Sequence, residues 1–376
     1  MDSNDVTGKI VLFSANVNGG IIQFVMTIYK TLHDLGFHVI CFIPSNADFT
    51  IDDKYQDNLV RYSLYTRRQN QLSRLIHKEK SIKRVVQEIL NQKPEVVWFL
   101  DNPLLSVQVA LQLNGKARRL LTLHDGGMRH PSNDKALMVI VRQWYKFILD
   151  KKIYRQLEDL LFLSEYCIHL YKHANPSIKA KLHMMKLPAH IPECNEVAPK
   201  EMSSEIDYYL FFGRIDKYKG LSTLLSAYNE FSQRDIRLVV AGSGQMTNLE
   251  QKLANSNGKV ILINRYIKDG EMNWLIRNAR AVVLPYIEAT QSGVIPVAYA
   301  FGVPVITSDV EGLTQMVDDG KTAIVCHESD DYVRALVSLS NDGKRSEMSA
   351  YAIDYYSKQL KIEKNISCLL SELGLM

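Results

Sequence analysis

Residues 9–44 read KIVLFSANVNGGIIQFVMTIYKTLHDLGFHVICFIP. Ile10–Phe13 is a short apolar run, and a polar loop that ends in Gly19–Gly20 follows it. Apolar side chains then recur at close to helical spacing until Gly36, and Val39–Ile43 is a second apolar run. The helical positions are Ile22, Val25, Met26, Tyr29 and Leu32. This order of strand, helix and strand predicts a β-α-β unit of a parallel sheet.

The alternation of apolar strands with helices continues along the chain and restarts near residue 207. Further strands of the first half are predicted at Val96–Leu100, Leu120–Leu123 and Asp159–Leu163. Those of the second half are Tyr208–Phe212, Ile236–Ala241, Val260–Ile263, Ala281–Leu284 and Val303–Thr307, separated by helices such as Gly220–Phe231 and Met246–Ala254. The pattern predicts an α/β protein with two doubly wound, Rossmann-like domains that face each other across a cleft.

The seam between the two halves is LPAHIPECNEVAPKEMSSE (Leu187–Glu205), which contains three prolines and shows no periodicity. We therefore predict an N-terminal domain over residues 1–190, a linker over 191–205 and a C-terminal domain over 206–353. A chain of 376 residues is also longer than one hydrophobic core usually serves.

Charge is distributed unevenly between the halves. Residues 1–190 carry 26 Lys and Arg against 17 Asp and Glu, whereas residues 191–376 carry 19 against 24. A basic half favours an anionic partner, such as a phosphorylated substrate, an anionic bilayer surface or nucleic acid. No apolar run approaches the roughly 18 residues that a membrane span needs, the acidic N-terminus does not resemble a secretory signal, and the five scattered cysteines favour a reducing cytoplasm.

Two glycine-containing loops follow predicted strands. Ser14–Gly20 (SANVNGG) lacks the G-x-G-x-x-G spacing, which counts against a dehydrogenase, although Gly19 and Gly20 would let backbone N–H groups approach a phosphate or sugar. A turn that simply requires glycine explains the loop equally well. Gly242 lies in a second such turn, AGSGQ (Ala241–Gln245), of a kind that nearly every doubly wound protein has.

FFGRIDKYKG (Phe211–Gly220) is more informative. Arg214 comes directly after a strand, and Lys217 and Lys219 precede the next helix. A guanidinium fork and a compact ammonium at the carboxyl end of a sheet would neutralise a diphosphate leaving group. A solvated basic loop is the alternative.

PYIEATQSGVIPVAYAFGVP (Pro285–Pro304) places a polar run between an apolar strand and an apolar helix. Ser292 or Thr290 is expected to cap that helix, and Pro296 falls in its first turn. The candidate ligand contacts are Glu288 on hydroxyl groups, and Thr290, Gln291 and the amides of Ser292, Gly293 and Val294 on an anion. A plain helix cap beside one exposed acid is the alternative.

LTLHDGGMRHP (Leu121–Pro131) ends a strand in His124 and Asp125, which could orient an acceptor hydroxyl or stabilise developing charge. No His, Cys or Glu spacing indicates a catalytic metal.

Two basic segments, Arg61–Ile89 and Ala136–Gln156, could lie on an anionic bilayer or could be domain helices with their apolar side in the core. No recognition motif supports binding to nucleic acid.

Together the segments FFGRIDKYKGLSTLLSAYNEF, AGSGQ, AVVLPYIEATQSGVIPVAYAFGVPVITSDVEGL and LHDGGMRH resemble family 4 retaining glycosyltransferases of the GT-B fold, most strongly over Tyr208–Asp330. The resemblance implies metal-independent transfer from a UDP- or GDP-sugar, with no further cofactor and with retention at the anomeric carbon. It also implies that the C-terminal domain holds the donor, that the N-terminal domain holds the acceptor, and that a final helix over about residues 354–376 packs back on the N-terminal domain.

By position, Arg214 and Lys219 resemble the pair that holds the donor diphosphate, and the amides of residues 292–294 resemble its second clamp. Gly19–Gly20 resembles the loop that closes over it, and His124 resembles the histidine near the reacting sugar. Arg265, Tyr266 and Ile267 lie where the family usually grips the base through backbone groups.

One departure from the family pattern stands out. The family commonly has two glutamates separated by seven residues, and alignment through Gly302 and Pro304 places Ala289 and Val297 there. Counting forward from Glu288 instead places Pro296 at the second position. The glutamate expected on the ribose is therefore missing.

The prediction is a cytoplasmic retaining transferase that moves a hexose-type unit from a nucleotide-sugar to a hydroxyl of a growing polysaccharide or lipid-linked glycan. The inner face of the membrane is the candidate location within the cytoplasm. A nucleotide-sugar 2-epimerase of the same fold and a non-catalytic, transferase-like binding protein remain the alternatives.

Overall fold

The computed structural model describes residues 8–17, 19–49, 51–63, 71–101, 104–124, 154–202, 206–231, 235–256 and 258–376. They form two compact units. Unit 1 comprises Met1–Lys186 together with Ile362–Met376, and unit 2 comprises Leu187–Lys361.

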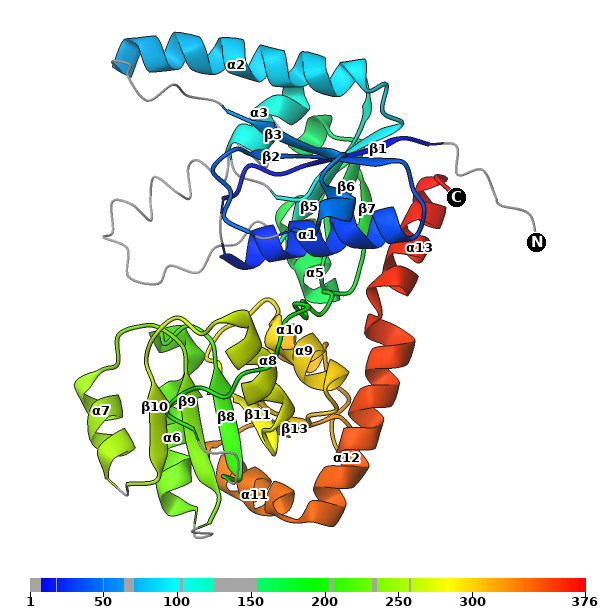
Figure 1. Ribbon diagram of the computed structural model, residues 1–376. Coiled ribbons are helices and arrows are strands. Elements are labelled where there is room, and N and C mark those ends of the chain that lie inside the picture. Colours follow the sequence, from blue (N-terminus) through cyan, green and yellow to red (C-terminus); the bar gives the residue numbers. More distant parts are fainter. Residues whose placement is uncertain are drawn as a thin grey trace. The chain divides into compact units, whose positions relative to one another are not determined.

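Unit 1 is built on a seven-stranded parallel sheet in the order β3-β2-β1-β4-β5-β6-β7 (Figure 1). Its strands are β1 (Ile10–Phe13), β2 (Val39–Pro44), β3 (Leu59–Tyr62), β4 (Val96–Phe99), β5 (Arg118–Leu123), β6 (Asp159–Phe162) and β7 (Lys181–Met184). Its helices are α1 (Gly19–Asp34), α2 (Gln71–Asn91), α3 (Leu104–Gln112), α5 (Glu165–Ala174) and α13 (Ile362–Leu373). The first β-α-β unit is confirmed, since all five apolar positions predicted for α1 are buried.

The sheet of unit 1 is covered on both faces. The central strands are wholly buried, and α2, α3 and α5 pack over one face around a core that includes Ile89, Val109 and Cys167. Helix α1 lies on the opposite face from α2 (Figure 1). Such double coverage explains why β1 and β4 are continuous apolar runs rather than alternating ones.

Unit 2 repeats the design with a six-stranded parallel sheet in the order β10-β9-β8-β11-β12-β13. Its strands are β8 (Tyr208–Phe212), β9 (Arg237–Ala241), β10 (Val260–Ile263), β11 (Ala281–Leu284), β12 (Val305–Ser308) and β13 (Ala323–Cys326). Its helices are α6 (Leu221–Glu230), α7 (Asn248–Asn255), α8 (Asp269–Arg277), α9 (Val294–Ala300), α10 (Glu311–Thr314), α11 (Ser329–Ser340) and α12 (Asp342–Tyr355). One core lies between the sheet and α8 and α9, and a second lies between the sheet and α6, α7 and α11.

The segment expected as a linker over 191–205 is held against α8 of unit 2 where the structure describes it. The Val197 amide donates to the carbonyl of Gly270 at 3.2 Å, and Asn273 Nδ2 donates to the carbonyl of Pro192 at 3.0 Å. An ion pair between Arg277 and Glu196 at 2.8 Å adds to these contacts. The chain therefore joins unit 2 at Leu187, a few residues before the expected boundary.

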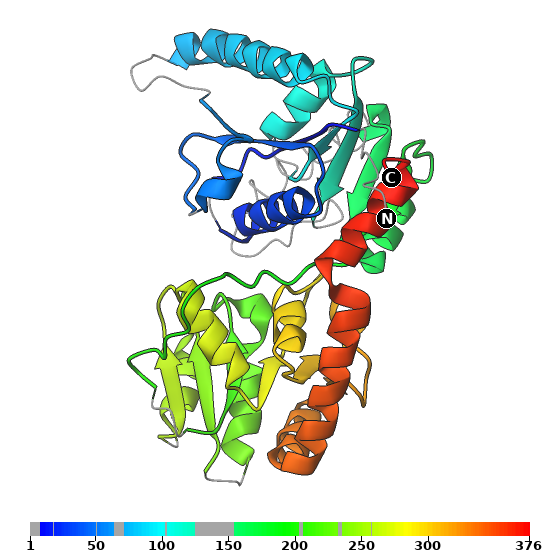
Figure 2. The ribbon, with the colours of Figure 1, turned by 45° about the vertical axis from the view of Figure 1, so that its right-hand side comes forward.

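The end of the chain differs from the single final helix that the sequence led us to expect. Helix α12 begins at Asp342, a π-helical turn covers Tyr356–Leu360, and Lys361 separates this turn from α13 (Figure 2). Only α13 belongs to unit 1, where it contacts α1. The passage between units thus falls at Lys361 rather than at residue 354.

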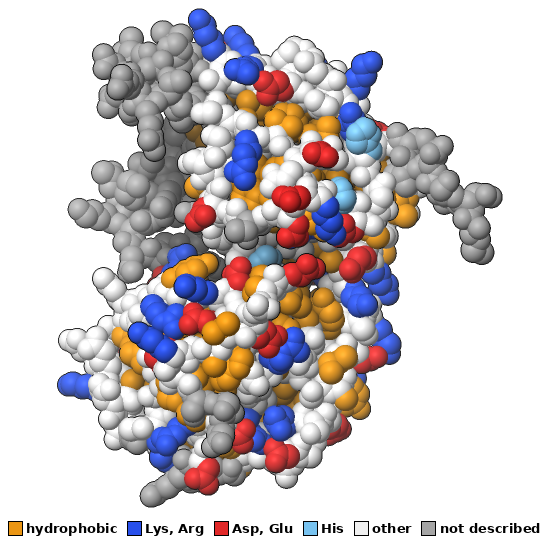
Figure 3. All heavy atoms as spheres, in the orientation of Figure 1, with side chains coloured by type: hydrophobic (Ala, Val, Ile, Leu, Met, Phe, Trp, Pro, Cys, Tyr) orange, Lys and Arg blue, Asp and Glu red, His pale blue; other side chains and the backbone are white. Residues whose placement is uncertain are grey.

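The basic segment Arg61–Ile89 forms β3 and α2 in its described parts. Ile82, Val85 and Val86 are buried in the core of unit 1, so this stretch of α2 turns its apolar side to its own domain and not to a bilayer. On the face seen in Figure 3, Lys and Arg side chains are intermixed with Asp and Glu. Within the described residues, no helix has the length and apolar content to cross a membrane. Most of Ala136–Gln156 lies outside the described residues.

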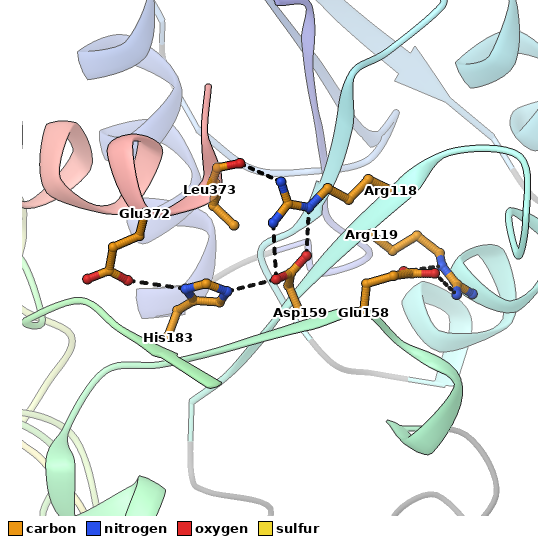
Figure 4. Close-up of polar contacts among 7 residues, drawn as sticks. All are labelled: Arg118, Arg119, Glu158, Asp159, His183, Glu372 and Leu373. Atoms are coloured by element: carbon orange, nitrogen blue, oxygen red, sulfur yellow. Dashed lines mark hydrogen bonds and ion pairs between the residues drawn. The ribbon is translucent and has the colours of Figure 1, made fainter. Parts of the chain in front are cut away.

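A polar network fixes α13 to the sheet of unit 1 (Figure 4). Asp159, which is 1% exposed, accepts from Arg118 at 2.7 Å and bonds His183 at 2.8 Å. His183 also reaches Glu372 of α13 at 3.2 Å, and Arg118 Nη1 donates to the carbonyl of Leu373 at 2.5 Å. Arg118 and Asp159 each begin a strand, so the network lies at the amino edge of the parallel sheet. It is therefore structural, because ligands of such sheets bind at the carboxyl edge.

This network predicts a stability that depends on pH. Burial opposes ionisation of Asp159, but His183 and Arg118 outweigh it and lower the pKa of Asp159 to about 2, while Asp159 and then Glu372 raise the pKa of His183 above 6.5. The carboxylate contributes stability that is lost as pH falls below about 4. The imidazolium contributes stability that is present below pH 6.5 and is lost as pH rises through its raised pKa.

We expect His183→Gln to lower the thermal midpoint at pH 6 by a few degrees, which corresponds to a loss of roughly 1–2 kcal/mol. At pH 9 the difference between the two proteins should shrink, because the stabilisation by the imidazolium is lost as pH rises through the raised pKa of His183. Thermal unfolding of both proteins at the two pH values measures this. An equal difference at both would contradict the assignment of a charged His183.

Candidate functional site

The carboxyl edge of the unit 2 sheet is where several candidate residues meet. The loop after β8 stays paired with the loop after β9, because the Gly213 amide donates to Ala241 at 3.0 Å and the Ile215 amide donates to Ser243 at 3.0 Å. Gly242 has φ +147°, and a Cβ there would lie 1.8 Å from the carbonyl oxygen of Gly213. The sequence therefore needs glycine at this turn to bring the two loops into contact.

Gly220 joins the same loop to the end of β11. It has φ +63°, and a Cβ there would lie 1.8 Å from the carbonyl oxygen of Pro285. Next to this contact, the Ile287 amide donates to the carbonyl of Tyr218 at 2.8 Å. The loop 213–220 is thus fixed to the loop that follows β11, and the two segments singled out from the sequence are neighbours.

Arg214 and Lys219 lie on this fixed loop. Arg214 is exposed and Lys219 is partly buried, and neither forms an ion pair with any residue that the structure describes. Lys219 Nζ lies 3.5 Å from the centre of the Tyr286 ring. Burial, and after it the charge of Arg214, lower the pKa of Lys219 to about 7, although Asp216 acts in the opposite direction. Two neighbouring cations, neither of them in an ion pair with a described residue, form a site suited to a multiply charged anion.

The loop after β11 differs from expectation at the start of the helix. The N-cap of α9 is Gly293, not Ser292 or Thr290. Ser292 Oγ accepts from the Val294 amide at 3.4 Å, and the Ser292 amide donates to Met316 Sδ at 3.3 Å. Of the three amides expected to clamp an anion, only that of Gly293 has no acceptor among the described residues. Pro296 lies in the first turn, as predicted.

The other candidates on this loop are placed differently from one another. Glu288 is exposed, Gln291 is partly exposed and Thr290 is buried. Ala289 and Val297, the positions reached by alignment through Gly302 and Pro304, are 8% and 4% exposed and lie in the apolar core. Pro296, the position reached by counting from Glu288, is also buried. None of these three positions carries a carboxylate in this chain.

Arg265 is already engaged within unit 2. Its guanidinium pairs with Glu271 at 2.7 Å and with Glu201 at 3.0 Å, and these contacts raise its pKa. Its amide donates to the carbonyl of Ile263, and Nη1 donates to the carbonyl of Tyr266. The side chain thus fastens the segment before β8 to α8. Contact with a base through the backbone of Tyr266 and Ile267 stays a prediction.

A cavity of about 620 Å³ opens beside the paired loops. It is lined by Gly244, Gln245, Met246, Gln251, Ala254, Asn255, Val260, Leu262 and Asn264. Asn264 accepts from the Gly244 amide at 3.1 Å and donates to its carbonyl at 3.2 Å, which holds the loops after β9 and β10 together. Apolar walls and carboxamide groups suit an uncharged polar ring, and the volume is in the range of small-molecule sites.

In unit 1 a buried carboxylate organises the loop that the sequence singled out. Asp101, fully buried at the end of β4, accepts at Oδ2 from Ser14 Oγ at 2.6 Å, the Ala15 amide at 2.9 Å and the Asn16 amide at 3.0 Å. Asn16 Nδ2 donates to the same oxygen at 2.7 Å, and Ser106 Oγ donates to Oδ1. The exposed Gly19 and Gly20 follow as the first residues of α1.

His124 lies at the end of the neighbouring strand β5. Its Nε2 is 2.8 Å from the carbonyl oxygen of Leu100, so this nitrogen carries the proton in the neutral ring and the lone pair is on Nδ1. The Phe24 ring packs edge-on against it at 5.0 Å. Asp125 and the rest of the loop to Pro131 lie outside the described residues.

Sequence reasoning missed two residues that these contacts bring forward, Asp101 and Tyr286. Each directly follows an apolar run, with Asp101 after Leu100 and Tyr286 after Pro285. The signal that could have found them was their position at the end of a strand.

No group of three or more His, Cys, Asp or Glu within the described part of the chain is arranged to hold a metal ion.

A family model described as Glycosyl transferases group 1 matches residues 207–342, which is the core of unit 2. This part of unit 2 is therefore similar to group 1 glycosyl transferases. The D-inositol 3-phosphate glycosyltransferase of Corynebacterium aurimucosum is 27% identical over 158 residues, which cover 39% of this chain and 38% of that relative. The resemblance to family 4 glycosyltransferases of the GT-B fold is thereby confirmed.

Solved structures extend the likeness of fold to the whole chain. Sucrose-phosphate synthase from Thermosynechococcus elongatus gives a TM-score of 0.73 at 17% identity and covers 98% of this chain and 99% of its own. Anabaena HepE, in complex with UDP-glucose, gives a TM-score of 0.68 at 12% identity, with coverages of 98% and 100%. The stretch that resembles group 1 glycosyl transferases is therefore the C-terminal half of a GT-B fold.

The close approach at Gly220 predicts a specific sensitivity in this glycosyl transferase domain. Gly220→Ala adds a Cβ against a backbone carbonyl at a left-handed φ and should destabilise unit 2 by roughly 2–5 kcal/mol. Gly293→Ala is the matched control, since Gly293 has φ −65° and a Cβ added there would meet nothing within 4 Å. Urea unfolding of both variants checks this, and similar midpoints for the two would contradict the packing.

Proposed function

We propose that this protein is a retaining glycosyltransferase that takes a hexose unit from a UDP- or GDP-sugar and transfers it to a hydroxyl of a growing polysaccharide or lipid-linked glycan. The observation that carries the proposal is the pair Arg214 and Lys219, without carboxylate partners in the described residues, at the carboxyl edge of a glycosyl transferase group 1 domain. Retention at the anomeric carbon rests on the resemblance to family 4.

The role proposed for Arg214 and Lys219 is to stabilise the diphosphate as it leaves. When the bond from the anomeric carbon to the diphosphate breaks, negative charge develops on the departing phosphate oxygen. Arg214 supplies a planar fork and Lys219 a compact ammonium, and both already lie at the site. Two fixed cations can take the part that a divalent metal takes in other transferases, which is the physical basis for proposing metal-independent transfer.

The remainder of the donor site is proposed from what adjoins the pair. The cavity shares Gly244 with the paired loops, and Gly244 bridges to Ile215, the residue after Arg214. A nucleobase in this cavity would therefore lie one residue from the cation that holds its diphosphate. Exposed Glu288 is proposed to bind sugar hydroxyls. UDP-glucose bound to Anabaena HepE, a protein of the same fold, supports this donor class.

The acceptor side is proposed from unit 1. Its excess of basic residues over acidic ones suits an acceptor with a phosphate or pyrophosphate group. His124, held by the Leu100 carbonyl, and Gly19–Gly20, anchored through Asp101, are the groups proposed to approach the reacting sugar. Action in the cytoplasm, at the inner face of the membrane, is part of the proposal.

The donor assignment is tested with UDP and GDP as probes in isothermal titration calorimetry. We expect the wild type to bind one of them, and Arg214→Ala or Lys219→Met to weaken that binding about 10- to 100-fold, as loss of a charge-assisted hydrogen bond implies. Lys217→Ala, an exposed cation on the same loop, is the control and should bind within about twofold of the wild type. Equal binding by all four proteins would contradict the site.

Turnover separates the three classes of protein. Incubated with the matching nucleotide-glucose but no acceptor, a transferase should release nucleoside diphosphate slowly, and faster when a glycan acceptor is added. Incubated with the corresponding N-acetylglucosamine donor, a 2-epimerase would convert the sugar without any acceptor. A protein that binds the nucleotide but never consumes a donor would be a binding protein, and the proposed activity would be wrong.

A further inference from the structure

The ring of Tyr286 lies beneath the Lys219 ammonium. Tyr286 is 2% exposed, and Lys219 Nζ lies 3.5 Å from its ring centre. The centre of the Tyr218 ring lies 5.1 Å from the same nitrogen. This ring packs edge-on against the ring of Tyr286. A cation over an aromatic face is attracted by the ring quadrupole, and the attraction grows as water is excluded.

Tyr286 is itself held in place by further contacts. Its hydroxyl lies 3.4 Å from Ser292 Oγ, and its carbonyl accepts from Ser308 Oγ at 2.6 Å. The residue before it, Pro285, abuts Gly220, the residue after Lys219. The ring is therefore rigid relative to the backbone of Lys219. The flexible partner is the four-carbon side chain of the lysine.

The charged groups around Lys219 make the contact with the ring a weak one. Arg214 repels the ammonium, Asp216 on the same loop attracts it, and the faces of Tyr218 and Tyr286 carry only partial negative charge. A diphosphate carries at least two full charges, so it would compete strongly for the lysine. Because the amine is partly neutral at pH 7 and above, a bound anion would also draw a proton onto it from solvent.

We propose that the Tyr286 ring is the resting place of the Lys219 side chain, and that the donor diphosphate draws the lysine away from the ring and binds it, as an ammonium, through its phosphate oxygens. Tyr286 is then a positioning residue, which keeps the lysine desolvated and aimed at the site before the donor arrives. This inference rests on the proposed function for its ligand, but the resting place itself concerns the unliganded protein.

Two variants separate the ring from the hydroxyl. Tyr286→Phe keeps the ring and removes only the contact to Ser292, whereas Tyr286→Leu removes the ring. We expect the wild type and Tyr286→Phe to take up close to one proton for each UDP or GDP bound at pH 8, and Tyr286→Leu to take up less than half of that. Calorimetry in two buffers of different ionisation enthalpy measures the uptake, and Lys219→Met sets its baseline.

The affinity for UDP or GDP should depend on pH, because binding is coupled to protonation of Lys219. The affinity of the wild type should fall about tenfold between pH 8 and pH 9, because each unit of pH makes protonation of Lys219 harder. In Tyr286→Leu the fall should be much smaller. Wild-type proton uptake in Tyr286→Leu would overturn the proposal, and so would an equal loss in Tyr286→Phe, because the hydroxyl rather than the ring would then be responsible.

A titration without ligand keeps the two proposals distinguishable. Carbon-13 labelled lysine side chains report the protonation of Lys219 by NMR, with Lys219→Met identifying the signal. A Lys219 that titrates near 10.5 in the wild type, its ordinary value, overturns the resting place whatever binds. Lys219 could instead titrate near neutrality in a wild type that binds neither UDP nor GDP. The contact of Lys219 with the Tyr286 ring would then be supported, whereas the proposed donor and the movement of the lysine onto it would both be wrong.

Discussion

The candidate site depends on the close approach of backbones at the carboxyl edge of the unit 2 sheet. Gly220 lies against the carbonyl of Pro285, and Gly242 lies against that of Gly213. A Cβ atom at either glycine would clash with the facing carbonyl oxygen. These contacts bring three loops together, those after β8, β9 and β11. Arg214, Lys219 and Tyr286 are neighbours only because of them. A parallel sheet supplies the edge, and the two glycines turn that edge into a binding surface.

Charge pairing shows which cations the fold leaves for a ligand. The buried Arg119 pairs with Glu158, Arg280 pairs with Asp207 and Asp342, and Arg265 lies between two glutamates. Lys219 is partly buried as well, but it has an aromatic ring in place of a carboxylate. Since a desolvated cation without an ion pair is costly, Lys219 is better explained by a ligand than by stability.

Strands buried on both faces could be predicted from the sequence, because they are continuous apolar runs. Edge strand Val260–Ile263 (β10) was found for the same reason, while edge strands Leu59–Tyr62, Lys181–Met184 and Ala323–Cys326 were missed. An edge strand has one neighbour and partly polar surroundings, as the exposed Arg61 and Lys181 show, so its pattern is weak.

The site was predictable to the level of its loops but not of its contacts. The pair Arg214 and Lys219 was visible because both follow a buried strand. The sequence could not show that Arg265 is engaged by Glu201, 64 residues away, or that Gly293 caps α9 in place of Ser292. Nor could it show that Tyr286 supports Lys219, since that contact depends on two glycines that bring distant loops together.

The most direct test of the donor site is a crystal structure with UDP or GDP bound. We predict that phosphate oxygens lie within about 3 Å of both Arg214 and Lys219, with the Lys219 ammonium displaced from Tyr286. A diphosphate bound away from both residues would contradict this assignment.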